Sequence, residues 1–362
     1  MKITRLRVEK LTKYFYGKKV LEDITFEVRS GSFSTILGPA GSGKTTLLRI
    51  IAGVEKPDNG KIYLDDRDVT YVAPMKRNIA LVYQTFALYP HLKVFDNIAS
   101  PLKAKKLSIS EIKEKVSHIS ELLGIKHLLD RYPRELSGGE KQRVALARAL
   151  VREAKLYLFD EPLTNLDYKL RETARTEFKK ICKLFRATLI YATPDPIDAL
   201  TMSDDTYVLY NGKLLQGGPV RQVYDLVTDI DVAKIFSYPS INLINAEVEV
   251  KDSKTYLNTP FISIELSFTL NPGKYILGIR PQDLCIISEK DYQSPSNSFR
   301  ARLHLTYIVG SETIAYAEVE GIDLILHLPY IYRISESKNI MISINTDRIF
   351  LFDEKSLRRV YP

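Results

Sequence analysis

The chain has 362 residues, a length typical of about two domains. Hydrophobic residues make up 45% and charged residues 27%, which excludes an intrinsically disordered protein, and no run approaches the ~18 apolar residues of a membrane-spanning helix. The net charge of +8 is dispersed along the chain, so we expect a solvated surface and no nucleic-acid partner.

Cysteine and histidine usage excludes two further classes of protein. Two cysteines, Cys182 and Cys285, are too few for a disulfide framework or a cysteine-based metal cluster, and the five histidines lack metal-ligand spacing. We therefore expect a reducing compartment. The first fifteen residues lack the apolar core of a secretory signal, so export by that route is not expected.

Residues 1–236 alternate apolar runs with amphipathic segments, which predicts an α/β domain with a largely parallel sheet. The expected strands are 33–37, 79–83, 156–159, 187–192 and 206–210. The expected helices are 45–52, 110–123, 140–151 and 168–184.

From about residue 237 the pattern changes to short alternating segments separated by turn signals such as Asn271-Pro272-Gly273. This pattern predicts a smaller, β-rich second domain of barrel or sandwich type over residues 237–362. Its expected strands are 246–250, 262–268, 275–279, 302–308, 313–319, 324–328 and 340–344.

The segment GPAGSGKT, Gly38–Thr45, fits the pattern G-x-x-x-x-G-K-[ST] between an apolar strand and an amphipathic helix. Glycines let such a loop turn its N–H groups toward one anion, and the following helix adds its positive N-terminal end. Lys44 can reach the β- and γ-phosphates, and Thr45 can offer its hydroxyl to Mg²⁺. The predicted nucleotide-binding residues here are Gly38, Pro39, Ala40, Gly41, Ser42, Gly43, Lys44, Thr45 and Thr46.

Two further motifs carry metal or anion chemistry. The apolar run LYLFDEP ends in Asp160, placed to hold Mg²⁺, and Glu161, placed to orient or deprotonate an attacking water. In LSGGEKQR, Ser137 is a good helix N-cap, and Gly138 and Gly139 let the backbone approach an anion. Because one triphosphate does not need two such helix starts, we interpret the second as serving a nucleotide held by a partner chain.

In this order the motifs resemble those of the ATP-binding subunits of ABC transporters, over essentially all of residues 1–236. Residues 38–45 match the family's Walker A loop, and Leu136–Glu140 match its signature. Asp160 and Glu161 match the Walker B aspartate and the catalytic glutamate. The resemblance implies a P-loop NTPase fold and the cofactors ATP and Mg²⁺.

The resemblance implies further site residues. Gln84, in LVYQTFALYPHL, matches the Q-loop glutamine, which senses Mg²⁺ and faces the membrane subunits, and LTNLD, ending at Asp167, matches the D-loop. Phe15 or Tyr16 resembles the aromatic residue that stacks on adenine, and the spacing leaves the choice open. The implied catalytic residues are Glu161 and Gln84, and the implied Mg²⁺ ligands are Thr45, Gln84 and Asp160.

A narrower resemblance is to the carbohydrate-importer subgroup, as in the maltose-type ATPases. ALYPHLKVFDNIA and EPLTNLDYKLR carry it in the first domain. GIRPQDL, Gly278–Leu284, and VGSETIAYAEV, Val309–Val319, are similar to the oligonucleotide-binding-like C-terminal domain of that subgroup. The resemblance implies that this domain contributes to dimerisation and regulation and does not bind nucleic acid.

The resemblance therefore implies a motor subunit of an importer for sugars or related polyols. Mg-ATP binding would close two subunits and hydrolysis would reopen them, while the surface near Gln84 and residues 87–91 passes the motion to the membrane. The implied partners are transmembrane permease subunits, a second ATP-binding subunit and an extracytoplasmic solute-binding protein. The chain would lie peripherally at the cytoplasmic face of the cell membrane.

One position departs from the family pattern, because the sequence reads Thr193-Pro194-Asp195 where the family has a histidine in a context like T-H-D. Proline has no side-chain donor and no N–H, and losing one preorganised donor typically costs on the order of 10²–10³ in rate. Alternatively, Thr193, a water or another nearby group substitutes for the histidine. We hypothesise an asymmetric heterodimer in which the site of this chain hydrolyses ATP poorly, while its residues 137–139 complete the competent site of a partner.

Two other functions are compatible with parts of the pattern. A mainly regulatory nucleotide-binding subunit would explain Pro194, but a retired site need not keep Glu161. A soluble ABC ATPase of translation or DNA repair usually has tandem cassettes or long coiled-coil insertions, and this sequence has one cassette and no heptad run.

Overall fold

The computed structural model describes residues 6–163, 168–184, 187–287, 297–334 and 337–361. The chain divides into two compact units, Met1–Val223 and Tyr224–Pro362, whereas the sequence pattern predicted a division after residue 236. Within the described residues, no helix combines the length and the apolar character needed to span a membrane.

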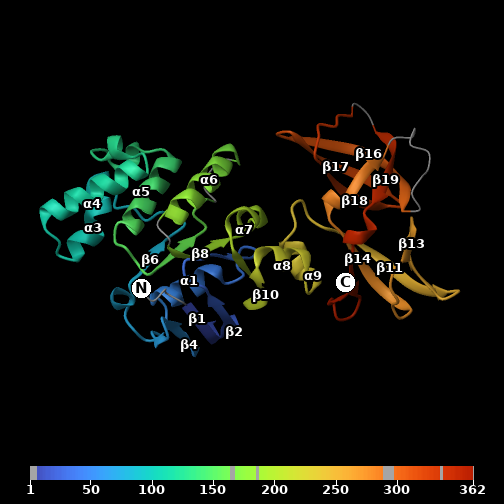
Figure 1. The fold of residues 1–362 in the computed structure, drawn as a ribbon, viewed down its shortest axis with the longest axis horizontal. Coiled ribbons are helices and arrows are strands. Elements are labelled where there is room, and N and C mark those ends of the chain that lie inside the picture. The colour runs from blue at the N-terminus through green and yellow to red at the C-terminus, as the bar shows by residue number, and fades with distance from the viewer. Residues whose placement is uncertain (1–5, 164–167, 185–186, 288–296, 335–336, 362) are drawn as a thin grey trace. The chain divides into compact units, whose positions relative to one another are not determined.

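A six-stranded sheet forms the centre of the first unit, in the order β10-β9-β3-β8-β7-β6 (Figure 1). Neighbouring strands from β9 to β6 run parallel, and only β10 is antiparallel to its neighbour, which confirms the predicted parallel character. The strands are β3 (Phe33–Leu37), β6 (Ile79–Val82), β7 (Leu156–Asp160), β8 (Thr188–Thr193), β9 (Asp205–Tyr210) and β10 (Lys213–Pro219).

Both faces of this sheet are buried by apolar cores, and strands β3, β6, β7 and β8 contribute to both because their successive side chains point to opposite faces. On β8, Leu189 and Tyr191 join one apolar core, while Ile190 and Ala192 join another. Helices α3, α4, α5 and α6 contribute to the first core, and α1 contributes to the second. These helices are α1 (Lys44–Ala52), α3 (Val94–Ala104), α4 (Ile109–Leu122), α5 (Gly138–Leu150) and α6 (Tyr168–Leu184).

The second core is closed by a four-stranded antiparallel sheet, β2-β1-β4-β5, which the sequence analysis did not predict. Register shifts interrupt β1 after Val8, and Lys10 has a positive φ of 47°, so the period-two pattern of this strand is broken. The strands are β1 (Leu6–Phe15), β2 (Lys18–Val28), β4 (Asn59–Leu64) and β5 (Arg67–Asp68). The shorter helices of the chain are α2 (Pro74–Arg77), α7 (Pro196–Met202), α8 (Val220–Asp225) and α9 (Ile230–Ile235).

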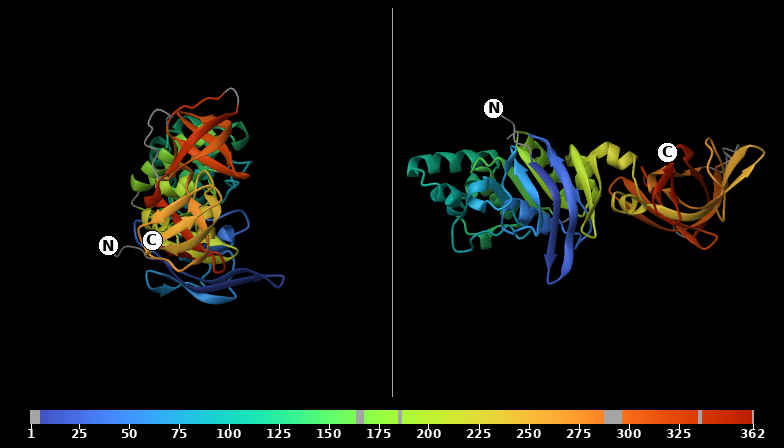
Figure 2. Two further views of the ribbon diagram at one scale, coloured as in Figure 1. Left: turned by 90° about the vertical axis from the view of Figure 1, so that its right-hand side faces the viewer. Right: turned by 90° about the horizontal axis from the view of Figure 1, so that it is seen from below.

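The second unit contains two antiparallel sheets, β13-β12-β11-β14-β20-β21 and β15-β19-β16-β17-β18, which confirms a β-rich second domain. Its orange and red strands surround a single apolar core (Figure 2). The first sheet is formed by β11 (Asn242–Lys251), β12 (Lys254–Asn258), β13 (Ser263–Leu266), β14 (Gly273–Ile279), β20 (Phe350–Asp353) and β21 (Arg359–Tyr361). The second is formed by β15 (Leu284–Ile287), β16 (Ser298–Val309), β17 (Glu312–Val319), β18 (Ile322–Leu328) and β19 (Lys338–Ile344).

Candidate active site

The parallel strands bring the predicted chemistry to one edge of the central sheet. The loop of residues 38–43 follows β3, Asp160 ends β7, Pro194 follows β8, and Gln84 comes two residues after β6. These strands are neighbours in the order β3-β8-β7-β6, so residues more than 100 positions apart lie at the same edge. Ligands of open α/β sheets bind at the carboxyl ends of the strands, which makes this edge the candidate site.

Backbone hydrogen bonds hold these strand ends together. The N–H of Gly38 donates to the carbonyl of Thr193 at 3.1 Å, and the N–H of Glu161 donates to the carbonyl of Ala192 at 3.0 Å. The loop after β3 and the acidic pair at the end of β7 are therefore both attached to the end of β8.

The loop of residues 38–43 surrounds the side chain of Lys44. Its ammonium group donates to the carbonyls of Gly38 at 2.8 Å and Pro39 at 3.0 Å, and the residue is only 3% exposed. Gly43 has a φ of 108°, and a Cβ on Gly38 would lie 2.1 Å from the carbonyl oxygen of Leu209. Glycine is therefore required at both positions, for conformation at one and for space at the other.

Two contacts join this loop and helix α1 to the acidic pair. The ammonium of Lys44 lies 3.1 Å from Oε1 of Glu161, and the hydroxyl of Thr45 donates to Oδ1 of Asp160 at 3.0 Å. Burial raises the pKa of Asp160, and the neighbouring Glu161 raises it further, while the hydrogen bond from Thr45 acts in the opposite direction.

These residues fit a triphosphate with Mg²⁺. Within the described residues the buried hydroxyl of Ser42 has no hydrogen-bond partner, and a Cβ on Gly41 would meet no atom within 4 Å, so this part of the loop is open to an approaching group. The Thr45 hydroxyl and the Asp160 carboxylate are the hard oxygen ligands that Mg²⁺ prefers. No group of three metal-ligating His, Cys, Asp or Glu side chains occurs among the described residues, so phosphate and water oxygens would supply the remaining ligands.

The second glycine motif forms the start of helix α5. Ser137 is the N-cap, its hydroxyl accepts from the N–H of Glu140 at 3.3 Å, and its own N–H donates to the Glu140 carboxylate at 2.7 Å. The bond from the Ser137 N–H is the main cause that lowers the pKa of Glu140. A Cβ on Gly139 would meet no atom within 4 Å, so the backbone here is open to an approaching group. Within the described residues no hydrogen bond connects Ser137, Gly138 or Gly139 to the loop of residues 38–43.

The remaining predicted site residues are Gln84, Asp167 and the two candidate aromatic residues. Gln84 is exposed after β6, and Asp167 lies outside the described residues. Tyr16 is fully exposed with a φ of 49°, whereas Phe15 is half-buried with the Lys13 ammonium 5.1 Å from its ring. The choice between the two aromatic residues remains open.

Pro194 is exposed at the end of β8, above a buried polar network that the sequence analysis missed. The hydroxyl of Thr193 donates to Asp198 at 2.7 Å and accepts from the N–H of Asp195 at 3.1 Å. Arg175 of α6 donates to both carboxylates, at 2.6 Å to Asp198 and 2.5 Å to Asp195. The sequence did contain a signal for this network. In the predicted helix 168–184, arginine recurs on the face that otherwise carries the apolar core residues.

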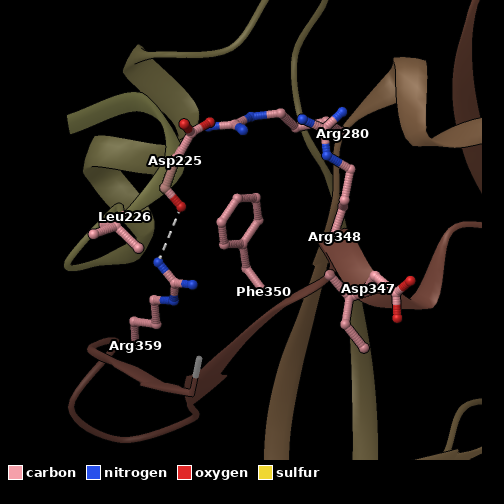
Figure 3. Close-up of a pocket in the computed structure, with 8 residues that line it drawn as sticks. Asp225, Leu226, Arg280, Asp347, Arg348, Phe350 and Arg359 are labelled. Carbon is pink, nitrogen blue, oxygen red and sulfur yellow. Dashed lines mark hydrogen bonds between the residues drawn. The ribbon is translucent and has the colours of Figure 1, made fainter. Parts of the chain in front are cut away.

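The second unit holds a separate cavity of about 270 Å³ (Figure 3). Arg280 and Arg359 lie on either side of the ring of Phe350 there, at 4.8 and 5.0 Å from its centre. Arg280 donates to the carbonyl of Tyr224, and Arg359 donates to that of Asp225 at 3.3 Å. These arginines therefore hold the backbone at the start of the second unit, and we assign the cavity no chemistry.

Comparison with known proteins agrees with this geometry. A family profile described as "ABC transporter" matches residues 21–164. The chain is 37% identical to the trehalose/maltose import ATP-binding protein MalK of Thermococcus litoralis, over 98% of this chain and 99% of that protein. It is 39% identical to the molybdate/tungstate import ATP-binding protein WtpC of Pyrococcus abyssi, over 96% of this chain and 100% of that protein. The solved structure of CbiO1 from Clostridium perfringens, part of an ABC transporter complex, matches with a TM-score of 0.56 and 30% identity, over 60% of this chain and 90% of that one.

Proposed function

This chain belongs to the ABC transporter family, as one of its ATP-binding subunits, and we propose that it drives the import of a sugar or related polyol. Members of this family are ATPases, and the chain carries the parts of an ATPase site. The observation that carries the ATPase function is the pair of contacts that join the phosphate loop to the acidic pair, Lys44 with Glu161 and Thr45 with Asp160.

The four residues that make these contacts divide the chemistry of ATP hydrolysis among them. The Lys44 ammonium would exchange its loop carbonyls and Glu161 for phosphate oxygens and place positive charge where negative charge develops. The Glu161 carboxylate, released from Lys44, would orient a water molecule and accept its proton. Thr45 and Asp160 would hold Mg²⁺, which neutralises phosphate charge when it is bound.

The solute is proposed from the relatives and from the local segments of the sequence. The name of the MalK relative gives trehalose and maltose, whereas that of WtpC gives two oxyanions. The segments ALYPHLKVFDNIA and EPLTNLDYKLR resemble the carbohydrate subgroup, and this favours a sugar or polyol. We also propose permease subunits, a second ATP-binding subunit and a solute-binding protein as partners, with the chain at the cytoplasmic face of the membrane.

A matched pair of measurements tests the ATPase site. Glu161→Gln keeps the size of the side chain and removes the base, so ATP affinity should remain while turnover falls by on the order of 10²–10⁴. Uptake of labelled maltose and of molybdate, with the chain reconstituted beside the permease subunits that co-purify with it from membranes, tests the solute. Equal loss of affinity and turnover would contradict the role of Glu161, and molybdate uptake alone would contradict the sugar.

We further propose that this chain works in an asymmetric heterodimer. Its own site lacks a side-chain donor at Pro194, and the hydroxyl of Thr193, the preceding residue in the sequence, already donates to the buried carboxylate of Asp198. The helix start at Ser137 and Gly139 is intact and open, so it could complete the site of a partner. Mixing this chain with a second ATP-binding subunit of the same importer type, one that carries the histidine at the position of Pro194, should raise turnover well above the sum of the two separate chains.

A further inference from the structure

Arg148, near the end of helix α5, contacts the segment that follows the exposed Gln84. Its guanidinium donates through Nη1 to the carbonyl of Ala87 at 2.8 Å and through Nη2 to the carbonyl of Phe86 at 2.7 Å. The ring of Tyr89 lies 5.6 Å from the same guanidinium. One side chain therefore holds three positions of a segment more than fifty residues away in the sequence.

The two carbonyls that Arg148 holds belong to residues in an unfavourable backbone conformation. Phe86 has a φ of 61° and Ala87 a φ of 45°, in the left-handed region that costs a residue with a Cβ about 1–2 kcal/mol. The side chain of Phe86 is 7% exposed and packs in the core of the helices. Such a conformation persists only where the surrounding structure holds it, and it occurs often in segments that switch.

No carboxylate offsets the charge of Arg148 among the residues that the structure describes. The side chain is half-buried, and burial lowers the pKa of its guanidinium. Hydrogen bonds from a charged donor are stronger than neutral ones, so the two carbonyls replace the water that the cation has lost. Because no described acidic side chain competes for the guanidinium, Arg148 is held at these two carbonyls.

A second anchor holds the rest of the segment. Asn97 of α3 is fully buried, its Oδ1 accepts from the N–H of Tyr89 at 2.8 Å, and its Nδ2 donates to the carbonyls of Tyr89 and Leu92 at 3.1 and 3.0 Å. Arg148 and Asn97 together attach residues 86–92 to helices α5 and α3. We call residues 84–93 the docking segment, because the family resemblance implies a contact with the membrane subunits near Gln84 and residues 87–91.

Helix α5 connects this docking segment to the second glycine motif. Ser137 caps the helix at one end, and Arg148 lies eleven residues later, about 16 Å along a rigid rod. We propose that Arg148 is a positioning residue that makes the start of α5 and the docking segment move as one body. An ATP-dependent displacement at Ser137 then reaches the membrane partner through this guanidinium. The inference rests on the proposed function, which supplies both the nucleotide and the membrane partner.

Hydrogen exchange on the full chain, with and without Mg-ATP, tests this coupling. In the wild type, Mg-ATP should slow exchange in both 137–148 and 84–93. Arg148→Lys keeps the charge but replaces the planar fork of the guanidinium with one ammonium on a shorter stem, so exchange in 84–93 should become about tenfold faster and lose its response to Mg-ATP. The response of 137–148 should persist. Arg131→Lys, at an exposed arginine of the same region, should behave as the wild type.

A second variant separates positioning from simple stabilisation. Ala87→Gly relieves the left-handed strain, so adding it to Arg148→Lys should recover thermal stability. The response of 84–93 to Mg-ATP should remain absent in this double variant. If glycine restores the response as well, or if Arg148→Lys alone keeps it, the positioning role is wrong.

The wild-type measurement distinguishes failure of this inference from failure of the proposed function. If 137–148 responds to Mg-ATP and 84–93 does not, the two regions are not coupled and the inference is overturned alone. If calorimetry shows no ATP binding and neither region responds, the proposed function fails, and the inference fails with it.

Discussion

The hydroxyl of Thr193 donates to the carboxylate of Asp198 across 2.7 Å, immediately before Pro194 in the chain. Asp198 is 2% exposed and also accepts from the hydroxyl of Tyr191 at 3.2 Å. The donor closest to Pro194 in sequence is therefore directed into the protein interior, away from the exposed end of β8.

Restoring a donor at residue 194 should accelerate ATP turnover. We expect Pro194→His to raise the turnover of the purified chain by on the order of 10², because one preorganised donor to a transition-state anion contributes about that factor. Pro194→Ala returns the backbone N–H without a side-chain donor and should change little. Steady-state phosphate release measures all three proteins. If the wild type already hydrolyses ATP rapidly and Pro194→His leaves that rate unchanged, another group already supplies the missing donor.

Removing the ammonium from the phosphate loop should weaken ATP binding. Lys44 is 3% exposed and contacts the loop carbonyls and Glu161, so Lys44→Ala should lower ATP affinity by about tenfold or more, as for a lost charged hydrogen bond. Lys18→Ala, at an exposed lysine, is the matched control. Equilibrium titration gives both affinities. An undiminished affinity in Lys44→Ala would contradict the assignment of the whole site.

The raised pKa of Asp160 predicts a pH dependence of Mg²⁺-assisted binding. The carboxyl must be ionised to hold the cation, and burial makes it protonate at a higher pH than an ordinary aspartate. As the pH falls through that raised pKa, the contribution of Mg²⁺ to ATP affinity should disappear. Calorimetry across the acid range gives the ATP affinities of the wild type and of Asp160→Asn. The protonation of ATP affects both proteins equally, so it cancels in the difference between them. A difference that stays constant down to the normal pKa of aspartate would oppose this assignment.

The buried network below Pro194 should be important for stability. Arg175→Met leaves the buried Asp198 without its cation, which typically costs about 3–5 kcal/mol of unfolding free energy. Arg171 lies 3.6 Å from Asp195 and is more exposed, so Arg171→Met should cost less than about 1 kcal/mol. Urea denaturation of the full chain measures both variants. Equal losses of unfolding free energy in the two variants would show that the ion pair with the buried Asp198 does not account for the effect of Arg175→Met.

Some features of the fold and of the candidate site could be predicted from the sequence, and others could not. The phosphate loop and the acidic pair were predicted because their chemistry depends on residue types at fixed short spacings. The partners of Arg148, by contrast, lie more than fifty residues away and are backbone carbonyls, which leave no mark in the sequence. The β2-β1-β4-β5 sheet was missed for a related reason, since bulges disturb the alternation that identifies β1.

By itself, the sequence determined the order of the chemical groups: a glycine loop with its lysine, a capped glycine turn, a carboxylate pair and a proline where a donor is expected. It also determined the change from helix-containing to β-rich architecture. Only the tertiary structure decided which of these groups meet. Parallel strand pairing placed Lys44 against Glu161 and attached the loop to the end of β8, and side-chain packing directed Thr193 toward Asp198. The physical reason is that spacing along a chain limits local geometry, whereas distances across a sheet depend on strand order and on which polar groups become buried.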